Sequence, residues 1–210
     1  MEGAVTIEGG FAEVGAGLWL MGRGQPAAFF GRASRRPRKG WRVRDRQHLD
    51  LVETSAVAKC ADSSHPFLTH IPCAAPVFAV SSKVLVAPAE ARRDARSVKL
   101  VPMSVRRALC VTEFGSSWVV MATLGRTGRV SLAEDETLSV RPEAAVAWTG
   151  KMPTGFCPKL SIWDILLPRG PRDLLFTFYG PGVVWLEGTA KLQNLQTAKF
   201  PNFSRRTYGA

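Results

Sequence analysis

The fold class is decided by residues 174–187, which read Leu174-Leu-Phe-Thr-Phe-Tyr-Gly-Pro-Gly-Val-Val-Trp-Leu-Glu187. Two apolar runs flank a turn made of Gly180, Pro181 and Gly182. Side chains alternate across a strand, so we expect the even-numbered residues of 174–179 on one face and the odd-numbered ones on the other. Pro181 presets φ and Gly182 is free to adopt a positive φ. This turn is therefore predicted to reverse the first strand into the second and to return Trp185 to the space between two sheets.

Similar short apolar runs recur upstream, from Lys83 onward. They are rich in Val, Leu, Phe and Trp, which suit a half-buried pleated surface, and Gly and Pro clusters separate them. Many short strands at close spacing predict an all-β fold, a β-sandwich or β-roll of short antiparallel strands. The strands expected are Lys83–Ala87, Val98–Val101, Ala108–Phe114, Trp118–Leu124, Arg129–Leu132, Thr137–Val140, Ala144–Trp148, Leu160–Leu167, Leu174–Tyr179 and Val183–Glu187.

Residues 128–148 form a unit of the same kind, in which strands alternate with the acidic turn Glu134-Asp135-Glu136 and the turn Arg141-Pro142-Glu143. Both units place strand, turn and strand within about 20 residues, a spacing typical of repeated β-hairpins. The three acids at the first turn are interpreted as a solvated hairpin tip rather than as a metal or acid–base cluster.

Composition limits the protein class. The chain has 210 residues, 46% apolar and 21% charged, which is typical of a globular protein of one large domain or one domain with a tail. Four cysteines are too few for a disulfide-built scaffold. No apolar stretch reaches the roughly 20 residues that a membrane-spanning helix needs.

The net charge of +11 is concentrated in one segment. Between Met21 and Gln47 nine basic residues accompany a single acid, Asp45. An Arg- and Ala-rich, acid-poor stretch is typical of an organellar targeting signal, while a solvated tail and a nucleic-acid-binding arm remain alternatives. We therefore expect residues 1–60 to be a basic, poorly ordered or cleaved N-terminal segment, residues 61–190 the β-sandwich domain, and residues 191–210 a tail. The patch comprises Arg32, Arg35, Arg36, Arg38, Lys39, Arg42, Arg44 and Arg46.

Two motifs carry a family resemblance. Residues 136–148, Glu136-Thr-Leu-Ser-Val-Arg-Pro-Glu-Ala-Ala-Val-Ala-Trp148, and the stretch 175–187 resemble the C-terminal part of the altered-inheritance-of-mitochondria protein 24 family. The match covers residues 128–190, and Asp135 and Glu187 replace the Gly and Gln of the family pattern. The resemblance implies a fold like that of the tryptophan RNA-binding attenuator protein, a place at the mitochondrial inner membrane and a scaffold role without catalysis.

Residues with catalytic chemistry are sparse. The three histidines, His48, His65 and His70, all precede the expected β domain's later strands, so none is available there for a serine nucleophile or a cupin metal. The cysteines at 60, 73, 110 and 157 form no C-x-x-C pair and are interpreted as buried free thiols, with a structural site of Cys60, His65, His70 and Cys73 as the alternative. The tryptophans are interpreted as core residues. We expect no catalytic residue, cofactor or metal.

The sequence thus predicts a non-enzymatic mitochondrial protein that supports inner-membrane organisation through contacts with other proteins. The alternative is a nucleic-acid-binding β module that uses the basic residues 32–46, in which case binding should weaken steeply with salt. In the first case the structural motif Gly180, Pro181, Gly182 and Trp185 serves only the fold.

Overall fold

The computed structural model describes residues 5–8, 10–22, 27–29, 33–35, 49–62, 65–99, 108–115, 117–156 and 175–188. These residues form nineteen strands and three one-turn 3-10 helices, and every strand pair is antiparallel. The predicted all-β sandwich of short antiparallel strands is confirmed. The helices are η1 (Ser81–Lys83), η2 (Ala89–Ala91) and η3 (Pro142–Ala144).

The strands belong to four sheets, whose members follow from one edge of each sheet to the other. Sheet A holds β1 (Val5–Glu8), β2 (Phe11–Val14), β7 (Ala58–Cys60) and β4 (Ala27–Phe29). Sheet B holds β5 (Ala33–Arg35), β6 (Leu49–Thr54), β3 (Gly17–Gly22), β10 (Val84–Pro88), β13 (Trp118–Thr123) and β8 (Phe67–Pro72). Sheet C holds β11 (Arg92–Lys99), β12 (Ala108–Phe114), β9 (Val77–Val80), β16 (Ala145–Thr149), β19 (Gly182–Glu187) and β14 (Thr127–Leu132). Sheet D holds β15 (Thr137–Val140), β18 (Leu175–Tyr179) and β17 (Thr154–Phe156).

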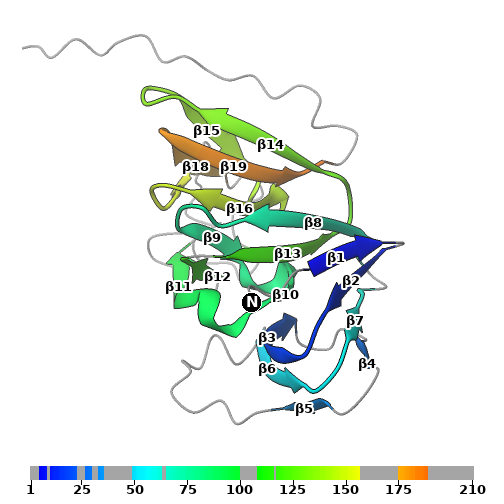
Figure 1. Cartoon of the computed structure of the whole chain (residues 1–210). Coiled ribbons are helices and arrows are strands. Elements are labelled where there is room, and N and C mark those ends of the chain that lie inside the picture. Colours follow the sequence, from blue (N-terminus) through cyan, green and yellow to red (C-terminus); the bar gives the residue numbers. More distant parts are fainter. Residues whose placement is uncertain are drawn as a thin grey trace, which may run out of the picture.

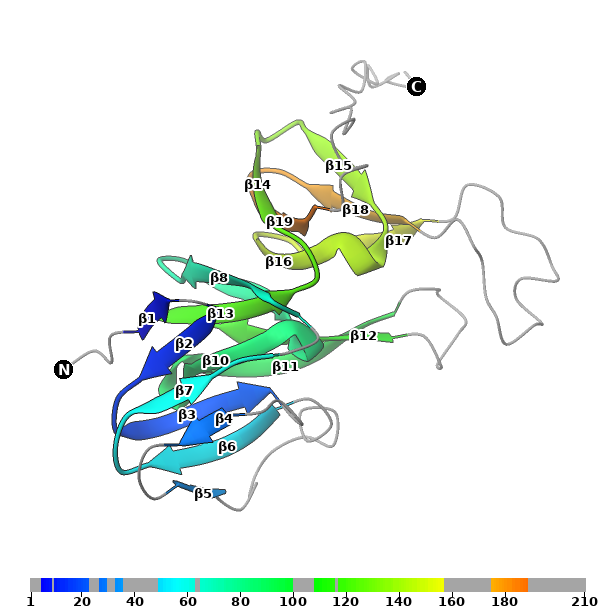
Figure 2. The same cartoon turned by 90° about the vertical axis from the view of Figure 1, so that its right-hand side faces the viewer.

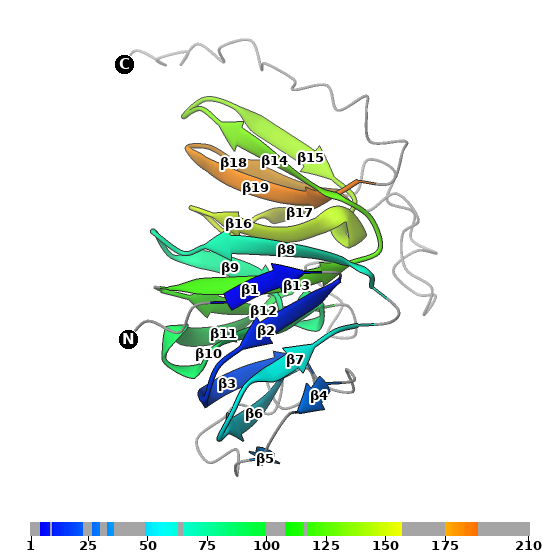
Figure 3. The same ribbon diagram turned by 45° about the vertical axis from the view of Figure 1, so that its right-hand side comes forward.

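Three hydrophobic cores bind these sheets into a stack in the order A, B, C, D. The first core joins sheets A and B through side chains such as Val14 and Trp19. The second joins B and C, for example through Leu20 and Phe114, and the third joins C and D through Trp148 and Phe176. The early strands β3–β6 accordingly lie at one end of the molecule and β14, β15 and β18 at the other (Figures 1 and 3).

Burial along each strand follows its layer. Sheets B and C have a core on both faces, and all six residues of β13 are buried. Such strands read as continuous apolar runs. Sheet D has a core on one face only, so β18 alternates: Phe176 and Phe178 are buried, and Tyr179 is exposed. The alternation predicted for 175–179 is therefore confirmed.

The predicted boundary at residue 60 is wrong. Strands β1, β2, β3, β6 and β7 all precede residue 61, and β3 pairs with both β6 and β10 at the centre of sheet B. Glycine-rich, weakly alternating sequence concealed these strands, because their stability comes from the sheets on either side rather than from local propensity. Of the basic patch only Arg35 lies among the described residues, on the edge strand β5. Residues 191–210 and the strand expected at 160–167 lie outside the described residues.

The predicted hairpin at residues 180–182 is also wrong. Strand β18 pairs with β15 and β17 in sheet D, whereas β19 pairs with β14 and β16 in sheet C. The turn is a crossing between layers, and the positive-φ glycines of the described residues are Gly10 and Gly150, not Gly182. Strands β14, β15 and β16 likewise enter sheets C, D and C rather than forming hairpins. A short turn next to an apolar run does not distinguish folding back within a sheet from crossing to the next one.

The internal repeat has a longer period than the sequence indicated. Each strand of sheet C is the sixth strand after the one at the same position in sheet B, as in β3 and β9 or β10 and β16. Sixty residues separate Gly17 from Val77, the starts of β3 and β9. Helices η1 and η3 precede β10 and β16. Both strands also shift register near their start, at 84–86 and 145–147.

Candidate functional site

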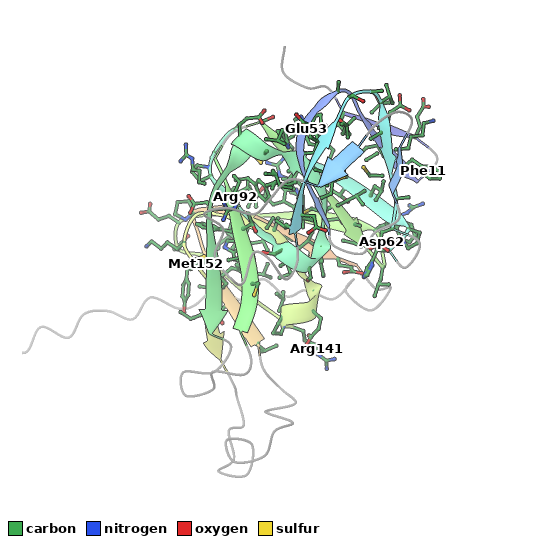
Figure 4. The ribbon with its side chains drawn as sticks, turned by 90° about the horizontal axis from the view of Figure 1, so that it is seen from below. Phe11, Glu53, Asp62, Arg92, Arg141 and Met152 are labelled. Atoms are coloured by element: carbon green, nitrogen blue, oxygen red, sulfur yellow. The ribbon has the colours of Figure 1, made fainter. Side chains whose placement is uncertain are left out.

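Three large apolar side chains are exposed at one end of the strands. Phe11 is 46% exposed, Phe67 41% and Leu124 63%. Phe67 begins β8 opposite Thr123, the residue before Leu124, and Gly10 lies close to the carbonyl oxygen of Pro66. The β1–β2 turn, the start of β8 and the β13–β14 turn lie on the same side in Figures 1 and 3. Figure 4 places Phe11 at the outer rim. We call Phe11, Phe67 and Leu124 the apolar end.

Leu124 stands on a turn that a buried carboxylate holds. Oε1 of Glu187 accepts the backbone N–H groups of Leu124 and Gly125. Glu187 is 7% exposed and ends β19 in sheet C, whereas the turn leaves β13 in sheet B. One side chain therefore fixes the chain where it passes from one layer to the next. Charge-assisted hydrogen bonds of this kind are among the stronger ones.

The other oxygen of Glu187 is paired with a lysine. Nζ of Lys83 lies 2.8 Å from Oε2 of Glu187 and also donates to the backbone oxygen of Glu143. Lys83 ends η1 and Glu143 lies in η3, so the pair joins two equivalent helices of the repeat. The side chains are 15% and 8% exposed. Each charge is satisfied by its partner and by backbone groups, which gives this cluster a structural role.

Three threonines fix the same turn from the other side. Oγ1 of Thr123 donates to the oxygen of Gly125 at 2.8 Å and lies near Oγ1 of Thr127. Oγ1 of Thr69 donates to Oγ1 of Thr127 at 2.9 Å. The turn that carries Leu124 is thus ordered before any partner arrives. Preorganisation of this kind lowers the entropy cost of binding.

The sequence did not single out the apolar end. Phe11 and Phe67 fall in the region predicted as a tail or as loosely β, and Leu124 is predicted as the last residue of a strand. A single exposed Leu or Phe carries no signal, because such residues are common on protein surfaces. Only the pairing of β8 with β13 brings Phe67 and Leu124 together.

The structural motif lies where sheet D crosses to sheet C. Gly180 is buried against backbone: a Cβ there would meet the oxygen of Ala133 at 1.7 Å. Trp185 is partly buried and packs against the core between sheets B and C. The prediction that Trp185 enters a core is therefore confirmed in part. Trp19, Trp118 and Trp148 are buried, with Trp19 and Trp118 ring centroids 5.8 Å apart.

The four residues of the alternative metal site do not come together. Cys60 is buried between sheets A and B, and Cys73 between B and C. His65 pairs with Asp62 at 2.8 Å, and His70 stacks near Trp118. Burial raises the pKa of the Cys60 thiol to about 12 and that of Cys73 to about 11, while desolvation lowers the pKa of His70. Within the described ranges no three His, Cys, Asp or Glu side chains gather as a metal site.

The acidic tip is solvated as expected. Glu134 and Asp135 are exposed in the turn before β15, and Oε2 of Glu136 accepts the N–H of Ala133 at 2.9 Å. The helices of the described residues are single turns, so none has the length to cross a membrane.

Comparison with known proteins identifies the fold. No protein-family model and no functionally curated protein matches the sequence. The structure is similar to the crystal structure of Protein SPYM3_0169 from Streptococcus pyogenes, with a TM-score of 0.65 over 89% of this chain and 93% of that chain. The two sequences are 10% identical, so the similarity establishes a shared β fold alone.

Proposed function

We propose that the chain is a non-enzymatic protein that acts through protein–protein contacts and supports organisation of the mitochondrial inner membrane. The observation that carries the contact part is the apolar end: three exposed apolar side chains stand together, and the turn under Leu124 is held by Glu187 and Thr123. Exposed apolar groups on a rigid support are typical of binding surfaces. The partner we propose is a protein that offers apolar side chains to this end.

The mitochondrial part of the proposal rests on sequence. It is supported by the Arg- and Ala-rich stretch after Met21 and by the family resemblance of residues 128–190. A signal in this stretch would have to act without cleavage, because β3 ends at Gly22, ahead of it, and is central to sheet B. The N-terminus of the imported protein should therefore lie before Gly17. Replacing Arg35, Arg36 and Arg38 with Gln should block import and leave the melting temperature unchanged.

The contact proposal is tested with Phe67→Ser combined with Leu124→Ser. The expected result is loss of specific cross-linked partners from mitochondria, with thermal unfolding within about 0.5 kcal/mol of the parent, as for surface changes. Val57→Ser is the matched control, because Val57 is also 41% exposed but lies by the other end of β2, where Val14 faces Ala58.

Two other outcomes would replace the proposal. Binding of the purified protein to protein-free vesicles, lost in the double variant, would make the apolar end a membrane contact. Retention of RNA through the basic residues, with the steep salt dependence of phosphate contacts, would favour the nucleic-acid alternative. Unchanged partners in the double variant would remove the apolar end from the function.

A further inference from the structure

Sheets B and C share one plan made of two halves. In sheet B the half β5-β6-β3 joins the half β10-β13-β8 through the β3–β10 pair. In sheet C the half β11-β12-β9 joins β16-β19-β14 through the β9–β16 pair. Every strand of C is again the sixth after its counterpart in B. Each complete sheet therefore holds a first half from one repeat and a second half from the next.

The same shift identifies sheets A and D as unmatched halves. Sheet D, β17-β18-β15, lies six strands after β11-β12-β9 and is a first half. The strands β4, β7 and β2 of sheet A lie six strands before β10, β13 and β8 and are a second half. The missing joint is a pair between β15 and β4. These strands lie at opposite ends of the molecule, so one chain does not close it (Figures 1 and 2).

We propose that β15 of one chain pairs antiparallel with β4 of a second copy, which completes a sheet on the plan of B and C across two molecules. The contact uses different edges on the two copies, and such head-to-tail contacts propagate into a closed ring or an open filament. The proposal does not depend on the apolar end or on the mitochondrial setting, since it uses neither.

The edge of β15 is prepared for such pairing. The N–H of Gly180 donates to the oxygen of Glu136 at 2.9 Å, in line with the register that sets Thr137 opposite Tyr179. In an antiparallel ladder bonded and non-bonded pairs alternate, so the amides of Thr137 and Ser139 point away from β18. The close hydroxyl contact of Ser139 with Thr177, 2.9 Å, fits a non-bonded pair. No strand of the described residues pairs with this edge.

Charge favours the same pairing. Antiparallel alignment brings the start of β15 next to the end of β4. The acidic tip, Glu134-Asp135-Glu136, directly precedes β15, and its first two residues are exposed. The sequence that follows β4 is basic, with Arg32, Arg35 and Arg36. Opposite charges therefore lie at the ends that the pairing brings together, and the assembly should weaken with salt.

The test is sedimentation velocity on the full chain, with Ser139→Pro as the decisive variant. The parent should form assemblies that dissociate on dilution and at high salt. Ser139→Pro removes an N–H that faces the neighbouring copy and should reduce the species to the monomer. Ser139→Ala retains the N–H and should assemble like the parent.

Ser131→Pro is the matched control on the outer edge of the complete sheet C. The N–H of Val183 donates to Thr149 on the β16 side, so Ser131, opposite Val183, also has an outward amide. Ser131 is exposed like Ser139. This variant should remain assembled, since no copy is proposed to pair with β14.

Hydrogen exchange of the parent gives a readout that needs no variant. The amides of Thr137 and Ser139 should exchange slowly in the assembly and quickly after dilution, while those of Leu138 and Val140 stay slow in both. Three results would overturn the proposal: a parent that is monomeric at every concentration, an assembly that survives in folded Ser139→Pro, or Thr137 and Ser139 amides that remain slow at every dilution. The last would mean that a segment of the same chain covers the edge.

Discussion

Glu187 is the residue on which most of the inter-layer turn depends. Its carboxylate accepts two backbone amides of the β13–β14 turn and pairs with Lys83. Glu187→Ala should cost about 3–5 kcal/mol, because it leaves a buried ammonium and two amides without their acceptor. Glu187→Gln, the residue of the family pattern, keeps a neutral acceptor and should cost less. Urea unfolding of both variants measures the difference, and parent-like midpoints would contradict this role.

The two buried thiols give a second prediction at the residue scale. Burial raises the pKa of Cys60 to about 12 and of Cys73 to about 11 from 9.0. Both pKa values lie above the unfolded value, so the associated stability is fully present below pH 9 and is lost as pH rises beyond it. Thiol alkylation read by mass spectrometry should be slow at both sites in the folded protein and fast in urea. Equal rates in the two states would show that the thiols are accessible.

At the scale of elements, the crossing from β18 to β19 depends on a missing side chain. A Cβ on Gly180 would lie 1.7 Å from the oxygen of Ala133, a backbone atom that has little room to move. Gly180→Ala should therefore cost about 1–3 kcal/mol, as overpacking does. Gly128→Ala in β14 is the control, because nothing lies within 4 Å of a Cβ there. Thermal unfolding compares the pair, and equal melting temperatures would refute the close approach.

Trp185 and Trp148 test how burial scales with layer. Trp148 is 0% exposed between sheets C and D, whereas Trp185 is only partly buried against the core between B and C. Full truncation of a core aromatic costs about 3–5 kcal/mol. We expect that loss for Trp148→Ala and about half of it for Trp185→Ala, measured by urea unfolding. A larger loss at Trp185 than at Trp148 would contradict this link between burial and stability.

At the scale of the whole molecule, the N-terminal residues belong to the stack. Deleting residues 1–60 removes β3 and β6 from sheet B and all of sheet A. The β10 edge would lose its partner and one core its opposite wall, so residues 61–210 should not fold cooperatively. A chain that begins at Val5 should fold normally. Near-UV circular dichroism distinguishes the two, and a cooperative transition in the shorter fragment would restore the boundary at residue 60.

Local sequence was enough to establish the fold class and the bounds of most strands after residue 107. Alternation in 175–179 and apolar runs such as 118–123 record how many faces of a strand are buried, and that signal is local. The solvated acidic tip and the buried tryptophans 118 and 148 were likewise predictable, since composition and spacing decide them.

Strand pairing, and therefore the site, depended on contacts between distant parts of the chain. Strand β3 has a weak local pattern and owes its place to β6 and β10. Turns such as 180–182 look alike whether the chain folds back or crosses to another layer. The apolar end joins residues more than fifty positions apart, and the two unmatched half-sheets follow from a repeat in pairing that sequence identity does not retain. Pairing is a long-range property: many sequences satisfy the same burial pattern, and only the packed layers select the register and the partner.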